Sequence, residues 1–195
     1  MSQEIITQAH TLFDTPEKWE AYIALKVQNE QIIKSWYQKM LSKANLYFSN
    51  NPVEGWGFHS WNPWDMRWHL NEFGNDSIEL WYRSAVEFGI WFNPAFYDQA
   101  KVYKLLKDTR HSKIISAMES TNAGIYQGQY IASERGNFEF GSPHDRNFNW
   151  ETLGWYAGNR SDEFVEQLAR KVDRFRKNKE ITDLLGELNR VSTKR

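Results

Sequence analysis

The sequence predicts an α+β fold: a mainly antiparallel sheet of about five strands packed against a long N-terminal helix and C-terminal helices. Apolar residues recur at helical spacing through 16–50, with no Gly or Pro after Pro16. After Gly55 the apolar residues alternate instead, which is strand spacing. Helical spacing returns near the C-terminus. We therefore expect one domain over 1–195, with the following parts: a short helix over 1–13, the long helix over 16–50, a sheet-rich core over 55–141 and C-terminal helices over 150–195.

The composition excludes several classes of site. With 24 basic and 25 acidic residues the net charge is -1, which argues against nucleic-acid binding by bulk charge. The chain contains no cysteine, so disulfides, thiolate nucleophiles and cysteine-based metal sites are excluded. The first residues lack the pattern of a signal peptide, and no apolar stretch approaches the roughly 20 residues of a membrane span. We expect a soluble, cytoplasmic protein without membrane contact.

The long helix has a clear start at Thr15-Pro16-Glu17, which supplies a hydroxyl N-cap, proline at the first helical position and an acid near the dipole. Its length would reach about 50 Å at 1.5 Å per residue. Such a helix exceeds most single domains, so either one end projects or the helix breaks near Gln28-Asn29. Its apolar stripe is expected to cover the sheet, with a homodimer seam as the alternative.

Three strands are predicted in the aromatic centre of the chain, where six of the ten tryptophans lie between Gly55 and Phe92. The first contains the alternating residues from Trp64 to Leu70, with a short helix from Pro63 as the competing interpretation. The others span 78–83 and 86–92. Burial of the apolar faces requires even positions to pair with even positions, and hence a connection of odd length such as 83–85.

Helices and a hairpin are predicted in the remaining chain. Asn93-Pro94 is expected to cap a helix that runs to about Lys107, and a short helix follows near 112–118. Segments 126–132 and 137–140 are expected to form a hairpin. Ser161 begins the last long helix, and a final helix covers 181–188.

The first candidate site is the polar face of the predicted strands, with acids and bases on alternate residues. Carboxylates on neighbouring strands can hold a divalent metal ion, as in metal-dependent nucleases with sheets of this kind. In those enzymes the last acid is followed by x-Lys, and neither Glu79 nor Glu87 is followed by that pattern. The competing interpretation is a solvated face with cross-strand ion pairs. The residues concerned are Asp65, Arg67, His69, Glu79, Arg83 and Glu87.

Tryptophans are the second candidate, because Trp81 and Trp91 fall on the same face. Exposed rings could stack on a ligand or a partner, whereas covered rings would simply belong to the core. Together with Arg67 and Arg83 they form the predicted binding residues.

Two further features carry weaker signals. The loop with His144 and Asp145 could support acid/base chemistry, although such pairs are common in turns. The basic helix Arg170–Lys179 could meet phosphates, with a charged solvent face as the alternative. His10, His59 and His111 have no evident companions, so we interpret them as structural or solvated.

These features predict a small cytoplasmic binding or regulatory protein that acts through the aromatic, charge-rich sheet face, without a bound metal or other cofactor. The sequence resembles no family whose motifs could be transferred, and it does not decide whether the protein is an enzyme. The alternative is a metal-dependent phosphodiesterase or nuclease-like enzyme that uses Asp65, Glu79 and Glu87 with Mg²⁺ or Mn²⁺, assisted by His69 or Arg67. Expected partners are another protein, nucleic acid through the basic helix, or a second copy.

Overall fold

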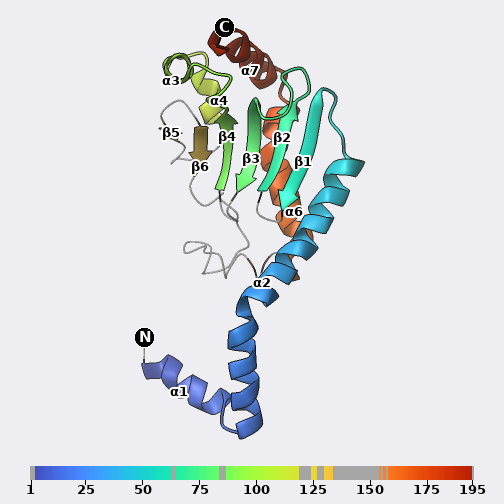
Figure 1. The fold of residues 1–195 in the computed structure, drawn as a ribbon, viewed down its shortest axis with the longest axis vertical. Coiled ribbons are helices and arrows are strands. Elements are labelled where there is room, and N and C mark those ends of the chain that lie inside the picture. Colours follow the sequence, from blue (N-terminus) through green and yellow to red (C-terminus); the bar gives the residue numbers. More distant parts are fainter. Residues whose placement is uncertain are drawn as a thin grey trace.

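The computed structural model describes residues 3–62, 65–83, 87–118, 124–126, 130–133, 154, 156 and 158–194. The predicted α+β class is confirmed (Figure 1). The helices are α1 (Gln3–Leu12), α2 (Pro16–Asn50), α3 (Gln99–Leu106), α4 (Ser112–Ser116), α6 (Ser161–Arg176) and α7 (Lys179–Ser192). The strands are β1 (Trp56–Asn62), β2 (Asp65–Leu70), β3 (Ile78–Arg83), β4 (Glu87–Phe92), β5 (Gly124–Tyr126) and β6 (Tyr130–Ser133).

The strands form one sheet in the order β1-β2-β3-β4-β6-β5, and every neighbouring pair is antiparallel. Where the sequence predicts about five strands, the main sheet has four of six or seven residues, and β6 and β5 add short segments beside β4. The predicted strand 126–132 is wrong, because Tyr126 pairs with Tyr130 across a chain reversal. In the sequence, Gly128 stands between the two paired segments, and glycine weakens a strand interior and favours turns. The other half of the predicted hairpin, 137–140, lies outside the described residues.

The predicted register of β3 and β4 is confirmed. Ile78 pairs with Phe92, Leu80 with Ile90 and Tyr82 with Phe88, so even positions face even positions. The strand interpretation of Asp65–Leu70 also holds, in preference to a short helix. As a result one face of the sheet is apolar and the other carries the polar residues.

The apolar face is covered by the C-terminal half of α2 and by α6, and α6 is seen behind the sheet in Figure 1. Ring contacts join the layers. The ring centre of Phe48 in α2 lies 4.8 Å from that of Trp68, and the ring centre of Phe164 in α6 lies 5.7 Å from that of Tyr82. These aromatic contacts bury the apolar face of a small sheet, since each ring removes a large apolar area from water. Helix packing against the sheet therefore follows the prediction.

Helix α2 is continuous over 35 residues and its N-terminal half projects from the body together with α1 (Figure 1). The Thr15 side chain accepts a hydrogen bond from the Lys18 N–H, as the predicted N-cap requires. Buried side chains of α2 begin only at Ile33, and α1 has none. Of the two alternatives for the long helix, the structure therefore shows the projecting end and no break near Gln28-Asn29. We call residues 3–30 the arm.

The helix predicted from Asn93-Pro94 begins later than expected, at Gln99. The Asp98 carboxylate accepts hydrogen bonds from the N–H groups of Ala100 and Lys101 and caps α3 there. Asn93 instead accepts from the Ala95 N–H in a local turn, which uses the same side-chain chemistry without starting a helix. At the far end, α7 extends beyond the predicted 181–188 in both directions. No described helix combines the length and apolar character that a membrane span needs.

Candidate metal centre

The centre of the polar face of the sheet is buried rather than solvated, while Asp65, Arg67 and Trp91 are partly exposed. Glu79 is completely buried, and the exposed fractions of Trp81 and His69 are only 5% and 8%. A carboxylate removed from water in this way needs compensating contacts, because its desolvation costs several kcal/mol in a protein interior. Arg67 of β2 and the turn before β3 supply them.

Arg67 joins two carboxylates across β2 and β3. Its Nη1–H donates to Glu79 Oε2 at 2.7 Å, while Nε–H and Nη2–H donate to the two oxygens of Asp65 at 2.8 and 3.0 Å. Hydrogen bonds to Asp65 and then to Glu79 raise the pKa of Arg67 above its usual value, so its charge is fixed. The guanidinium carbon also lies 5.4 Å from the centre of a Trp91 ring. Arg67 is therefore locked in one orientation and holds Glu79 in turn.

The second oxygen of Glu79 is directed toward a histidine. Glu79 Oε1 accepts a hydrogen bond from the Asp76 N–H at 3.1 Å and lies 3.8 Å from His59 Nε2. Asp76 has a positive φ of 63°, in the left-handed region that Asp tolerates better than most residues. The turn before β3 thus helps to fix the carboxylate that Arg67 anchors from the other side.

His59, His69 and Glu79 each offer one donor atom, and these atoms lie within 4.8 Å of one another. The ring centres of the two histidines are 5.5 Å apart. His69 Nδ1 is buried and has no hydrogen-bond partner within the described part of the chain. Burial, and then the proximity of His59, lower the pKa of His69, which favours the neutral imidazole that binds metal ions.

Gly57 provides the space for the His69 ring. The two residues are partners in the β1–β2 ladder. A Cβ atom at position 57 would lie 2.5 Å from both Cε1 and Nε2 of His69 and 2.9 Å from Asn71 Oδ1. Only glycine therefore allows this position of the imidazole without displacement.

Two imidazoles and one carboxylate form a ligand set found around zinc and non-haem iron. Metal–nitrogen and metal–oxygen bonds of about 2.0–2.2 Å place neighbouring donors roughly 3.0–3.5 Å apart. The separation of 3.8 Å between His59 Nε2 and Glu79 Oε1 needs only a small side-chain rotation to reach that range. Three protein ligands leave coordination positions for water or another ligand.

The sheet brings together some of the predicted site residues and separates others. His69 and Glu79 face each other in the ladder, and Arg67 lies beside them. Asp65 and Glu87 both pair with Arg83, at the other end of β3. That row is four residues from Glu79 along β3, about 13 Å at 3.3 Å per residue. Of the side chains of Arg83 and Glu87 the structure describes nothing.

The predicted binding tryptophans differ in exposure. Trp81 is buried, whereas Trp91 is partly exposed next to Arg67. The Trp91 ring is therefore partly open to solvent, while the Trp81 ring is buried on the polar face and is not among the residues of the main hydrophobic cluster.

Sequence reasoning missed His59 and Gly57 because it did not predict β1. The signal was present: Trp56 and Phe58 alternate with Gly57 and His59, which is strand spacing. Glycine within this segment resembles a loop signal. His59 was interpreted as structural or solvated because it had no evident companion in the sequence.

The two weaker candidates gain less from the structure. His144 and Asp145 lie outside the described residues. In the predicted basic helix, Arg176 is buried and bonded to Asp173, which also pairs with Lys177 at 2.7 Å. Part of that helix's positive charge is thus neutralised locally.

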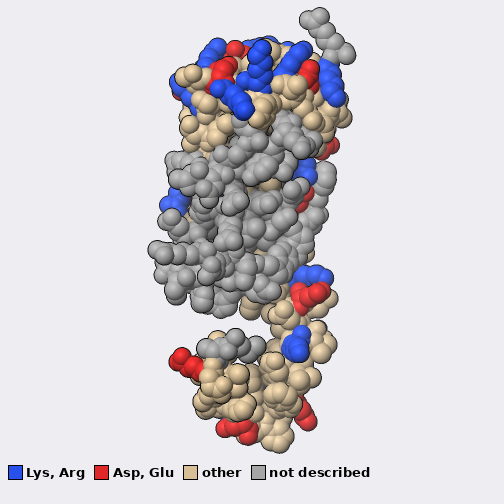
Figure 2. All heavy atoms as spheres, turned by 90° about the vertical axis from the view of Figure 1, so that its left-hand side faces the viewer, with Lys and Arg blue, Asp and Glu red and all other residues tan. Residues whose placement is uncertain are grey.

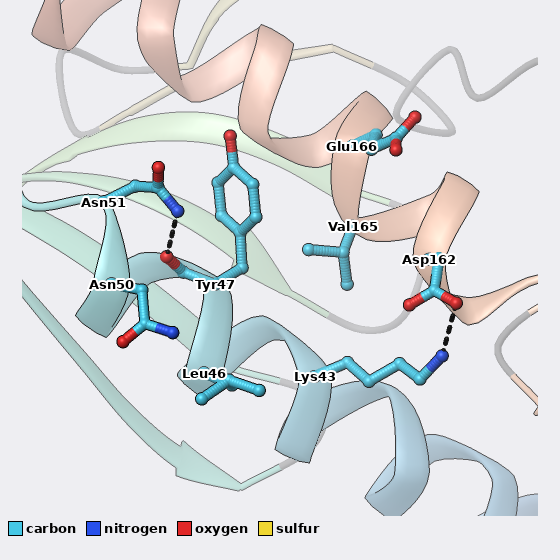
Figure 3. A pocket seen from close by; sticks show the side chains of 8 residues that line it. All are labelled: Lys43, Leu46, Tyr47, Asn50, Asn51, Asp162, Val165 and Glu166. Carbon is cyan, nitrogen blue, oxygen red and sulfur yellow. Dashed lines mark hydrogen bonds and ion pairs between the residues drawn. The ribbon is translucent and has the colours of Figure 1, made fainter.

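A separate groove of about 380 Å³ lies between α2 and α6 (Figure 3). Lys43 and Asp162 approach to 2.5 Å across it and neutralise each other. The groove holds no comparable cluster of buried donors among its lining residues, so the sheet face remains the stronger candidate. Its walls include Lys43, Leu46 and Tyr47 of α2 and Asp162, Val165 and Glu166 of α6.

Comparison of the chain with protein-family models, with curated proteins and with solved structures found no match. The functional argument therefore rests on the geometry and chemistry of the described residues.

Proposed function

We propose that this protein binds one divalent transition-metal ion through His59, His69 and Glu79, and that its polar sheet face acts through this ion. The observation that carries the proposal is the convergence of three donors within 4.8 Å, from the buried Glu79 and His69 and the partly buried His59. His69 Nδ1 adds to it, because a buried polar atom without a hydrogen bond costs about 1–3 kcal/mol. A metal ion bound by this nitrogen would turn that cost into a favourable contact.

A purely structural ion-pair network explains the arrangement of these residues less well than a metal centre does. Arg67 and the Asp76 N–H already stabilise Glu79, so a purely structural network would not need the His59 and His69 imidazoles beside it. In a metal centre each part has a role. Glu79 is a ligand, and Arg67 and the Asp76 N–H orient it, as outer hydrogen bonds commonly do for metal-bound carboxylates.

The ligand set favours zinc, iron, cobalt or manganese over magnesium. Imidazole nitrogen suits the transition metals, whereas Mg²⁺ and Ca²⁺ prefer oxygen ligands.

The proposal thus retains the expected role of the sheet face and takes Glu79 and His69 from the metal-dependent alternative. His59 replaces the more distant Asp65 and Glu87.

Hydrolysis at the ion is a second candidate function. The observation that favours it is the number of protein donors, since three ligands leave room for a metal-bound water. Bound zinc lowers the pKa of such a water to about 7. Arg67 does not complete a phosphate site here, because its guanidinium is occupied by Asp65 and Glu79.

Isothermal titration calorimetry of metal-free protein with Zn²⁺, Mn²⁺ and Mg²⁺ tests the proposal. We expect one Zn²⁺ per chain, weaker Mn²⁺ binding and no Mg²⁺ binding in the same concentration range. His59→Gln and Glu79→Gln should each weaken Zn²⁺ binding at least tenfold, because loss of one of three ligands removes a direct metal bond.

His10→Gln is the matched control, since His10 is exposed on α1, far from the sheet in sequence and fold. It should leave Zn²⁺ affinity unchanged. Circular dichroism of each variant before titration separates loss of a ligand from loss of folding. Zn²⁺ binding that survives in folded His59→Gln, or that depends equally on His10, would refute the site.

A further inference from the structure

The outward face of α3 is basic and aromatic. Val102 and Leu106 point into the core, while Lys101, Tyr103, Lys104 and Lys107 are exposed. No acidic residue interrupts the helix, since Gln99–Leu106 reads QAKVYKLL. Figure 2 shows Lys and Arg side chains gathered at this end of the molecule, formed by α3, α4 and α7, with fewer acids among them.

Positive charge is concentrated at this end although the chain is nearly neutral. Residues 98–118 contain five Lys or Arg and two Asp, a formal charge of +3, against -1 for the chain. The arm contains five acids and two lysines, a charge of -3. The basic character of the α3 end is therefore a local feature, which bulk charge did not reveal.

The cations of α3 are less neutralised than their neighbours. Arg110 pairs with Glu187 at 2.8 Å and Lys113 with Glu180 at 2.5 Å. Lys107 lies 4.2 Å from the centre of the Tyr103 ring, a cation–π contact. Lys101 and Lys104 form no ion pair with any residue that the structure describes. These two lysines are available to an external anion.

Exposed rings accompany the lysines. Phe96, in the turn before α3, has an exposed fraction of 50%, and Tyr103 one of 37%. Proteins that bind single-stranded nucleic acid combine two components: positive charges that contact the phosphate backbone, and aromatic rings on which the bases stack. An acidic protein surface would also contact such rings, because aromatic side chains are enriched at protein interfaces, so the competition test below separates the two occupants.

We propose that the α3 face, consisting of Phe96, Lys101, Tyr103, Lys104 and Lys107, binds single-stranded nucleic acid without sequence preference. Lys101 and Lys107 are six residues apart, about 9 Å along the helix at 1.5 Å per residue. This length spans two or so phosphates, with bases stacked on Tyr103 or Phe96. Each phosphate neutralised on a single strand contributes a slope of about -0.7 to the logarithmic salt dependence. The inference is independent of the metal centre.

Fluorescence anisotropy with a labelled 20-nucleotide oligothymidylate, measured from 50 to 200 mM KCl, tests this surface. The variant Lys101→Glu/Lys104→Glu should weaken binding at least tenfold and reduce the salt slope by about 1.4 units, which is about 0.7 for each of two phosphate contacts. Lys26→Glu/Lys34→Glu on α2 is the matched control, because it changes the net charge equally at another exposed site. It should weaken binding less than threefold. Tyr103→Ala should weaken binding at least fivefold through loss of stacking.

Equal losses in the two double variants would overturn the proposal, because bulk charge would then explain the binding. An unchanged affinity in Tyr103→Ala would remove the stacking argument on which the choice of nucleic acid rests. Competition provides a third test: polyglutamate that displaces the oligonucleotide at the same charge concentration would assign the face to an acidic protein instead. Absence of binding at 50 mM KCl would refute the surface altogether.

Discussion

The His69 imidazole lies against the backbone of Gly57, its partner across the β1–β2 ladder, where a side chain would come within 2.5 Å of the ring. This close approach sets the position of one donor of the candidate metal centre. It also ties the centre to a glycine whose backbone is part of the sheet. A single methyl group at position 57 should therefore test the geometry of the site.

Gly57→Ala is expected to displace the His69 ring and to weaken Zn²⁺ binding at least tenfold. Overpacking of this kind costs about 1–3 kcal/mol of unfolding free energy, because the ring and Asn71 must both move. Calorimetry measures the affinity, and urea denaturation of the metal-free protein measures the stability.

Gly186→Ala provides the control for Gly57→Ala. Gly186 is buried, and a Cβ there meets its nearest neighbour at 3.9 Å, within ordinary contact distance. Alanine in this helical position should raise stability by up to about 1 kcal/mol and leave Zn²⁺ affinity unchanged. If Gly57→Ala also binds Zn²⁺ normally, the His69 position in the structure is not the one that binds the ion.

Removal of Arg67 should destabilise the protein more than removal of both partners of its buried ion pair. Arg67→Ala leaves the fully buried Glu79 carboxylate without its cation, which costs about 3–5 kcal/mol. In Arg67→Ala/Glu79→Gln the uncompensated charge is absent, so the double variant should be more stable than Arg67→Ala alone. Urea denaturation of the two single variants and the double variant gives the coupling energy. Additive losses would mean that Glu79 and Arg67 do not interact in solution.

Acid should destabilise the metal-free protein partly through His69. Because burial lowers the pKa of His69 in the folded state, the unfolded chain binds the proton more readily. Its contribution to stability is present above about pH 6.5, the ordinary histidine value, and is lost as the pH falls toward the lowered folded pKa. We expect the stability difference between wild type and His69→Gln to shrink from pH 7.5 to pH 5.5 in urea denaturation. A constant difference would contradict the lowered pKa of His69.

The sequence correctly predicted which residues share a face of the sheet, but not whether the polar face is exposed to solvent. Alternation placed Ile78, Leu80 and Tyr82 on one face, and the observed register agrees. That prediction assumed that carboxylates stay in water, yet Glu79 is fully buried on the opposite face. Its burial depends on Arg67 and on the Asp76 N–H, whose positions follow from the tertiary structure. The alternation of apolar residues, and whether a residue stands at an odd or even position, carry no information about such contacts.

The candidate centre was only partly accessible to sequence reasoning for a similar reason. His59, His69 and Glu79 come from three successive strands and are separated by ten residues each, a spacing that matches no ligand motif. Their meeting depends on the ladder register, in which His69 pairs with both Gly57 and Glu79. Without β1 in the predicted sheet, His59 had no companions.

The apolar pattern of α2 predicts a helix but does not tell which part of it is covered. Trp19, Ile23 and Val27 repeat at the spacing that continues in the buried half, yet all three are exposed. Helical spacing is a property of the chain itself, whereas burial depends on where the sheet and α6 end. The arm therefore had to be located in the structure.

Two substitutions in α2 should separate the arm from the body. Met40 is fully buried against the sheet, so Met40→Ala should reduce the free energy of unfolding by about 2–5 kcal/mol. Leu25 has an exposed fraction of 57%, and Leu25→Ala should change it by less than about 0.5 kcal/mol, since alanine is at least as good a helix former. Urea denaturation at two protein concentrations measures both effects. A loss in Leu25→Ala that grows with protein concentration would instead mean that the arm is covered in solution by a second copy, because only association couples stability to concentration.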